Sequence, residues 1–131
     1  MTSRRITLLG WLLAFVLAIA GCGSEGGADA GVKADLALDP SPPVVGQNKV
    51  LLKLSDSSGK SLAGATIKLE GNMNHAGMKP SFADLEETSP GVYAGALDFT
   101  MGGDWFILVT GQTADGKRIE HKIDVNGVKA K

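Results

Sequence analysis

The alternation of apolar and polar side chains restricts the possible folds of this chain more than any other feature. In the segment 65–70, Ala65, Ile67 and Leu69 alternate with polar residues, and Val50 begins the same pattern in the segment 49–54. Successive side chains of a β-strand point to opposite faces, so a period of two gives one apolar face and one polar face. The pattern predicts strands that bury one face in a core.

Seven segments that read as short strands follow one another after residue 32, separated by short stretches rich in Gly, Pro, Ser and Asp. The expected strands span 33–38, 49–54, 65–70, 83–87, 92–100, 105–111 and 118–125. The segment 105–111 is apolar on both faces and is expected to be central in its sheet. Asp115-Gly116 is a hairpin signal between the last two strands. The spacing predicts an all-β fold, a single immunoglobulin-like antiparallel β-sandwich of about seven strands.

The amino-terminal segment is typical of a signal peptide. Arg4 and Arg5 precede an apolar stretch, 6–20, that ends on small residues. This stretch of about 15 apolar residues is shorter than the roughly 20 needed to cross a bilayer, so we expect a cleaved leader rather than a membrane span.

The leader closes on Ile19-Ala20-Gly21-Cys22, which resembles the bacterial lipobox and contains the single cysteine of the chain. In that motif the cysteine is acylated and becomes the new amino terminus. Cys22 is therefore the expected lipidation site, and two or more acyl chains would anchor the protein durably to a lipid bilayer. The alternative is an ordinary signal peptide beside a chance cysteine. We expect a location in the cell envelope, facing the periplasm or the cell exterior.

These features divide the chain into four parts. We expect a lipoprotein signal peptide at 1–21, the lipidated Cys and a Gly-rich flexible tether at 22–32, the β-sandwich domain at 33–126 and a polar tail at 127–131. The part after the leader is long enough for one domain and too short for two.

Composition and motifs exclude several functions. The leader holds two of the 13 basic residues and none of the 14 acidic ones, so the processed chain is mildly acidic and nucleic-acid binding is not expected. With Cys22 acylated, no thiol remains for a disulfide or a cysteine nucleophile. The adjacent carboxylates Glu86 and Glu87 would point to opposite faces of a strand, and only two histidines are present. We expect a protein that is not an enzyme.

Antiparallel strands place successive connections at alternate ends of a sandwich. The connections 39–47, 71–82 and 101–104 then share one end, which we call the distal end, because the tether enters the first strand from the opposite end. The unusual residues Met-Asn-His-Ala-Gly-Met, 73–78, and Met-Gly-Gly-Asp-Trp, 101–105, gather there.

A Met/His cluster is the candidate site at the distal end. Thioether sulfur is a soft ligand that suits Cu(I), and imidazole also binds copper. Met73 and His75 share a face if the segment is extended, and a turn allowed by Gly77 would bring Met78 back toward them. With Met101, these residues form a candidate set for Cu(I).

Each of these residues also has a simpler interpretation. Methionine commonly fills irregular gaps in a core, which applies to Met73 and Met78, and Met101 continues the apolar face of the segment 92–100. The alternative for His75 is a surface histidine that binds no metal. Trp105 either covers a bound Cu(I) ion with its ring or belongs to the core.

Other polar residues are weaker candidates. His121 shares a strand face with Ile119 and Ile123, which favours a packed histidine over a ligand. Asp104 and Glu70 are single acids near loops, where a solvated role is the common one.

Motifs across 39–125 resemble the YtkA-like and FixH-like domains. They are Pro-Pro-x-x-Gly-x-Asn, Leu-Ser-Asp-Ser-Ser-Gly-Lys-Ser-Leu-Ala-Gly-Ala, Met-x-His-x-x-Met, Pro-Gly-Val-Tyr and Met-Gly-Gly-Asp-Trp. The resemblance implies a small extracytoplasmic β-sandwich associated with copper handling and oxidase assembly, with a copper-transport or oxidase-assembly protein as partner. The residues of this chain that match the family motifs, and to which the resemblance assigns the site, are Met73, His75, Met78, Met101 and Trp105. FixH-like proteins have a membrane helix of their own, which this chain would lack after processing.

Two hypotheses follow from the sequence. The first is a lipoprotein that binds or delivers Cu(I) through the Met/His cluster. The second is an interaction or accessory module of the envelope, in which the methionines are packing residues and the distal loops contact another protein.

Overall fold

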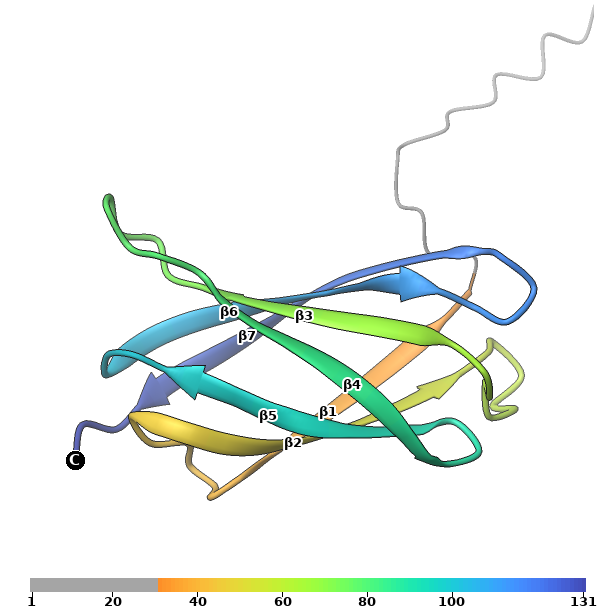
Figure 1. The fold of residues 1–131 in the computed structure, drawn as a ribbon, viewed down its shortest axis with the longest axis horizontal. Helices are drawn as coiled ribbons and strands as arrows, with labels where there is room; N and C mark the ends of the chain where they lie inside the picture. The colour runs from red at the N-terminus through yellow and green to blue at the C-terminus, as the bar shows by residue number, and fades with distance from the viewer. Residues whose placement is uncertain (1–30) are drawn as a thin grey trace, which may run out of the picture.

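Seven β-strands without a helix form the part of the chain that the computed structural model describes, residues 31–131 (Figure 1). The strands are β1 (Lys33–Asp39), β2 (Gly46–Ser55), β3 (Thr66–Asn72), β4 (Ser81–Ser89), β5 (Val92–Phe99), β6 (Gly103–Gln112) and β7 (Arg118–Val128). Every expected strand is present, and most extend one to three residues beyond the alternating pattern. Residues 31–131 contain no helix long and apolar enough to cross a membrane.

The strands pair in the order β1-β2-β5-β4-β3-β6-β7, and every neighbouring pair is antiparallel. Strand β4 joins the two layers: residues 81–85 pair with β3, whereas Glu86, Glu87 and Ser89 pair with β5. Strands β1, β2 and β5 thus form one layer, and β3, β6 and β7 the other. This is the strand arrangement of an immunoglobulin-like sandwich, as the sequence predicts.

A short parallel contact closes the open side of the sandwich. Val44 and Lys129 form an isolated parallel bridge. The Val45 N–H donates to the Lys129 carbonyl at 2.8 Å, and the Lys129 N–H donates to the Pro43 carbonyl at 2.9 Å. The strand β7 ends at Val128, which is buried, so the chain stays attached to the domain beyond the expected strand end at 125.

The core lies between the layers and consists of the inward residues that the alternation predicts. Leu52, Leu69, Ile107 and Val109 are completely buried, and burial of each such side chain stabilises the fold by about 1.5–3 kcal/mol. Strand β6 lies between β3 and β7, which confirms its central position, and its outward residue Leu108 is half-buried.

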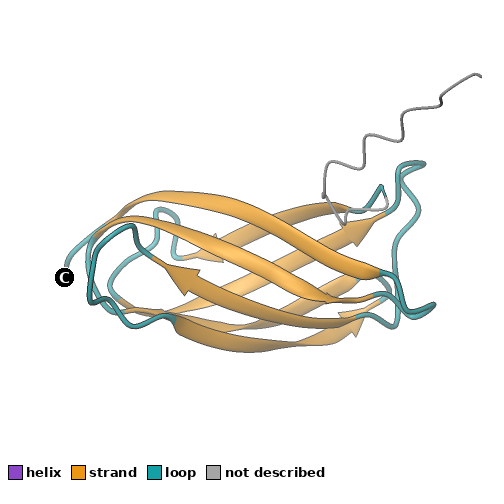
Figure 2. Ribbon diagram, turned by 90° about the horizontal axis from the view of Figure 1, so that it is seen from above, coloured by secondary structure: helices purple, strands orange, loops and turns teal. Residues whose placement is uncertain are grey.

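The loops gather at the two ends of the sandwich, as Figure 2 shows in teal. The β1–β2, β3–β4 and β5–β6 connections share the distal end, and β1 begins at the opposite end (Figure 1). The arrangement follows directly from the antiparallel order and agrees with the sequence prediction.

Polar contacts to the backbone hold the end opposite the distal end. The Tyr93 hydroxyl donates to the Leu62 carbonyl at 2.6 Å and accepts from the Ala65 N–H at 3.0 Å. A Glu87 carboxylate oxygen accepts from the Gly64 N–H at 3.0 Å and the Gly91 N–H at 3.2 Å. These contacts tie the β2–β3 connection to the β4–β5 turn.

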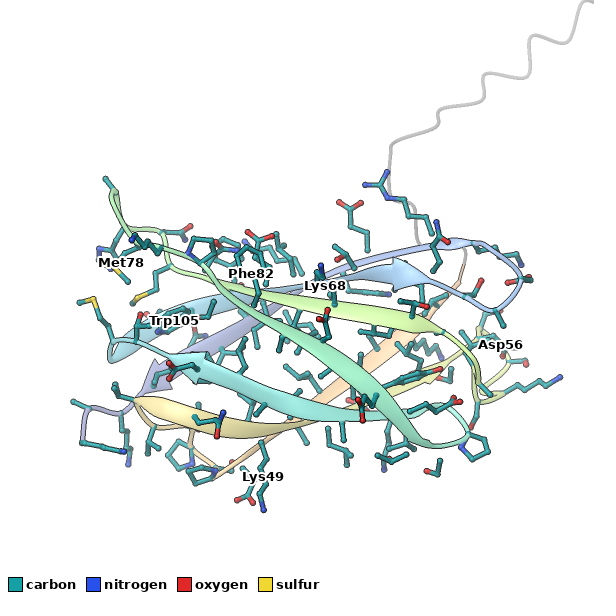
Figure 3. All side chains as sticks on the ribbon, viewed as in Figure 1. Lys49, Asp56, Lys68, Met78, Phe82 and Trp105 are labelled. Carbon is teal, nitrogen blue, oxygen red and sulfur yellow. The ribbon has the colours of Figure 1, made fainter. Side chains whose placement is uncertain are left out.

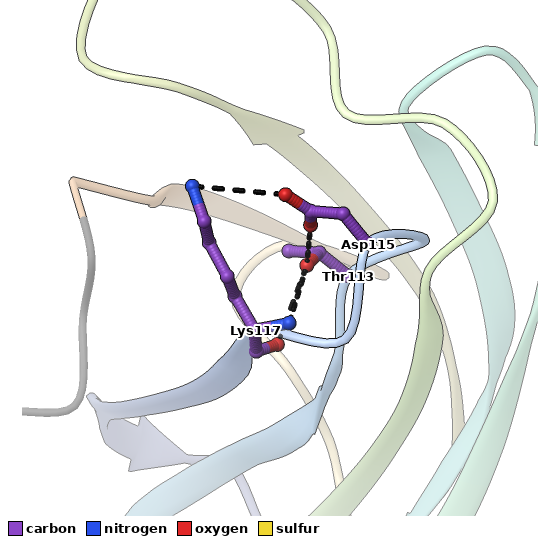
Figure 4. Close-up of polar contacts among 3 residues, drawn as sticks. All are labelled: Thr113, Asp115 and Lys117. Atoms are coloured by element: carbon purple, nitrogen blue, oxygen red, sulfur yellow. Dashed lines mark hydrogen bonds and ion pairs between the residues drawn. The ribbon is translucent and has the colours of Figure 1, made fainter.

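The β6–β7 hairpin at the same end is closed by its own side chains (Figure 4). The Thr113 hydroxyl donates to Asp115 and accepts from the Lys117 N–H at 2.9 Å, while Lys117 and Asp115 form an ion pair at 3.7 Å. The hydrogen bond from Thr113 lowers the pKa of Asp115, with a smaller contribution from the charge of Lys117.

Replacement of the Tyr93 hydroxyl should destabilise the domain. Tyr93→Phe leaves the Leu62 carbonyl and the Ala65 N–H without their partner, which costs about 1–3 kcal/mol. Urea unfolding followed by circular dichroism measures the change. Thr88→Val is the control, because the Thr88 hydroxyl makes one exposed hydrogen bond of 3.4 Å. Equal stability of the two variants would contradict a structural role for the Tyr93 hydroxyl.

Glu87 should make the domain sensitive to acid. Hydrogen bonds from the Gly64 and Gly91 N–H groups lower the pKa of Glu87 below its ordinary value of 4.5. A lowered pKa in the folded state means that the carboxylate stabilises the fold above the unfolded-state pKa, and that this contribution is lost as the pH falls through the folded-state pKa. We expect the Tm of Glu87→Gln to fall less between pH 6 and pH 3 than that of the parent. Glu86→Gln, which removes the neighbouring carboxylate, should keep the parent's profile.

Candidate metal site at the distal end

The β3–β4 loop carries Met73, His75 and Met78. Met73 directly follows β3 and is 9 % exposed, because it packs into the core. The Met78 N–H donates to the His75 carbonyl at 3.4 Å, which turns the chain back, and the side chain of Met78 packs half-buried against the core. His75 lies exposed at the tip of the loop.

The β5–β6 turn carries Met101 and leads into Trp105. The Trp105 indole N–H donates to the Met101 carbonyl at 2.9 Å, and the ring, 2 % exposed, meets Phe99 edge to face with centroids 5.2 Å apart. Met101 itself is 50 % exposed. Strand β5 ends at Phe99, so the alternation that would have turned Met101 inward stops before it.

The two loops meet around Met73. A Cβ atom at Gly103 would lie 3.2 Å from the Met73 methyl carbon, so the absence of a side chain at Gly103 makes room for this thioether. The sulfur atoms in Figure 3 all lie at the end marked by Met78 and Trp105. They belong to Met73, Met78 and Met101, the sulfur-containing residues between 31 and 131. The structure therefore places three thioethers, carried by two loops, at the same end of the sandwich.

The weaker candidates have structural roles. The Asp104 carboxylate accepts from the Gly127 N–H at 2.9 Å, and a Glu70 carboxylate oxygen accepts from the Asn72 side-chain amide at 3.1 Å. His121 is half-buried on the inward face of β7, which agrees with the packed interpretation. Trp105 belongs to the core, and its indole N–H is already used.

The donors at the distal end suit a soft ion. Within residues 31–131, no three side chains drawn from His, Cys, Asp and Glu come together as a metal site. A metal ion at the distal end would therefore depend on thioether sulfur, which favours Cu(I) and disfavours hard divalent ions. The expected lipidation site, Cys22, lies outside the described residues.

Sequence reasoning missed the structural role of Asn48, which holds the β1–β2 connection at the distal end. Its side chain is completely buried. The side-chain amide donates to the Val44 and Gly46 carbonyls at 2.7 and 2.8 Å, and its oxygen accepts from the Val44 N–H at 3.1 Å. A polar residue at an inward strand position is the signal that identifies such a role.

The strand order defines a small immunoglobulin-like β-sandwich, and two of its distal loops carry thioethers. The model of the YtkA-like family matches residues 28–110, more than half of the 131 residues, and the chain belongs to this family. The match covers β1 to β5 and most of β6, including Met73, His75, Met78, Met101 and Trp105. The comparison with curated proteins gave no match.

A side chain at Gly103 should disturb the contact that positions Met73. Gly103 has a φ of +121°, and Gly103→Ala adds crowding against Met73 to backbone strain of about 1–3 kcal/mol. Gly116→Ala is the matched control, because Gly116 also has a positive φ, +86°, with nothing within 4 Å of an added Cβ. We expect chemical denaturation to show a larger loss of stability for Gly103→Ala. A larger loss for Gly116→Ala would show that Met73 does not crowd position 103.

Proposed function

We propose that this protein is a lipid-anchored protein of the cell envelope that binds Cu(I) at the distal end through Met73, Met78, Met101 and His75. The observation that carries the proposal is that two separate loops bring three thioethers to the same end of the sandwich, where Met73 lies against Gly103 and the Met101 backbone is bonded to Trp105. Neutral sulfur donors match a soft monovalent ion, and they remain usable in an oxidising compartment where a thiol would be consumed.

The four residues would contribute differently. Met73 is the inner ligand, because its side chain is held in the core beside Gly103. Met78 and Met101 approach from the surface, and the flexible thioether chain lets each sulfur turn toward a shared ion. His75 is exposed at the loop tip and would join by closure of the β3–β4 loop. Trp105 lies in the core and would act by holding the Met101 backbone in place.

The position of the site suits transfer to another protein. The described chain enters β1 at one end of the sandwich, and the β3–β4 and β5–β6 connections, which carry the methionines, lie at the other (Figure 1). An anchor at Cys22 would leave the distal end facing away from the bilayer. The proposed partner is a copper-transport or oxidase-assembly protein, in keeping with the resemblance to FixH-like domains.

One observation favours a second candidate function, an interaction module of the envelope that binds no metal. Phe82 on β4 is 62 % exposed, beside Glu70 of β3 in the sheet register. Phe82 would supply the aromatic anchor of such a contact, since aromatic residues are enriched at protein interfaces. In this case Met73 and Met78 are packing residues.

An anaerobic Cu(I) titration against a chromophoric competitor tests the proposal, with Ag(I) and Zn(II) in parallel. The protein carries Cys22→Ser, so that no thiol competes. We expect one Cu(I) or Ag(I) ion per chain and weak Zn(II) binding.

The double variant Met78→Leu/Met101→Leu should lower Cu(I) affinity by at least about tenfold, while the stability changes little, since leucine replaces methionine at similar volume. His75→Ala should lower affinity less. Phe82→Ala is the control and should bind as the parent does. Absence of Cu(I) binding by the parent would overturn the proposal and favour the interaction module.

A further inference from the structure

The three thioethers of the distal end differ sharply in exposure. Met101 is 50 % exposed, Met78 is half-buried against the core and Met73 is 9 % exposed. A dissolved oxidant reaches an exposed thioether more readily than a buried one. The three sulfurs of one cluster therefore have different access to the same reagent.

The fold keeps Met101 on the outside. Its carbonyl accepts the hydrogen bond of the buried Trp105 indole, so the backbone at this position is fixed to the core. The next residue, Gly102, lies against the carboxy-terminal segment, where an added Cβ would come within 3.1 Å of the Val128 carbonyl oxygen and 3.2 Å of the Ala130 nitrogen. The β5–β6 turn is thus held by Trp105 on one side and by the carboxy-terminal segment on the other. Since Gly102 and Gly103 carry no side chains, neither shields the Met101 sulfur.

We propose that Met101 is an oxidation site, and that its conversion to the sulfoxide by a peroxide releases the soft metal ion from the distal end. The second half of the inference rests on the proposed function, because it concerns the same cluster. The first half concerns the exposure of Met101 alone.

The chemical step needs a peroxide as the oxidant. The Met101 sulfur attacks one oxygen of H2O2 and the O–O bond breaks. An S–O bond forms, and the proton on the transferred oxygen passes to the departing hydroxide to give water. The sulfur loses two electrons, which the peroxide accepts. Met101 and H2O2 thus become methionine sulfoxide and water, and a sulfoxide reductase can reverse the change.

Oxidation changes the donor as well as the polarity of the side chain. A thioether is a soft ligand for Cu(I), whereas the sulfoxide presents a hard oxygen. The modified side chain is already half exposed, so the added oxygen needs no place in the core. The domain should therefore stay folded after losing one ligand. The same change at Met73 would put a polar group into the core and disturb the fold.

The experiment uses the full-length protein with Cys22→Ser, treated with limited H2O2 in the absence of metal. Mass spectrometry with peptide fragmentation follows each methionine over time. We expect Met101 to be oxidised first, at a rate near that of free methionine, then Met78, with Met73 at least about tenfold slower than Met101. Oxidation of Met73 or Met78 before Met101 would overturn the inference.

Ag(I) then reports on binding, because it resembles Cu(I) as a soft ion and is not itself oxidised by peroxide under these conditions. The protein oxidised at Met101 should bind Ag(I) at least about tenfold more weakly than the parent, and methionine sulfoxide reductase should restore the affinity. Prior binding of Ag(I) should slow the oxidation of Met101, since the metal occupies a sulfur electron pair.

Met101→Leu is the matched variant. It should start with the weaker affinity, and the same dose of H2O2 should cause no further loss. Unchanged Ag(I) affinity after oxidation of Met101 would overturn this inference and remove Met101 from the ligand set, while metal binding through Met73, Met78 and His75 would still stand. Failure of the untreated parent to bind Ag(I) or Cu(I) would instead overturn the proposed function, and with it the release of metal.

Discussion

The buried indole of Trp105 couples the core to the distal end. A Trp N–H removed from water needs an acceptor, and the Met101 carbonyl, 2.9 Å away, supplies it. The ring meets Phe99 edge to face at the point where β5 ends, so both sides of the turn depend on this one side chain. The position of Met101 follows from that contact. The indole thus fixes one part of the candidate site without itself being a ligand.

Glycine makes the second contribution to the distal end. The Met73 methyl group occupies the space that a side chain at Gly103 would take, which allows a core residue to lie directly beneath an exposed turn. Met73 is consequently both a packing residue and the innermost thioether. The sequence offered core packing and metal binding as alternatives for Met73. The two are compatible, because a sulfur at the edge of a core can contact apolar neighbours on one side and an ion on the other.

The fold could be predicted from the sequence because alternating apolar and polar residues show which side of each strand is buried. Val50, Leu52 and Leu54 of β2 all face the core, as their spacing predicts. The same rule places Met101 inward, and there it is wrong, because the alternation holds only while the strand continues, and β5 ends two residues earlier. Contacts between distant segments could not be predicted, because they produce no local sequence pattern. The Tyr93 hydroxyl bonds to the backbone of Leu62 and Ala65, and nothing in the sequence near Tyr93 indicates these two hydrogen bonds.

The two ends of the sandwich are built from different interactions, and the difference bears on function. Side-chain hydrogen bonds to the backbone fix the end opposite the distal end, through Tyr93, Glu87 and Thr113. At the distal end, Asn48 fixes one connection, whereas the other two present flexible thioethers. The proposed ion would have to be both held and passed on, which needs ligands that reorient at low cost on a rigid frame. Met78 and Met101 would supply the mobile ligands, and the contacts of Asn48 and Trp105 would supply the frame.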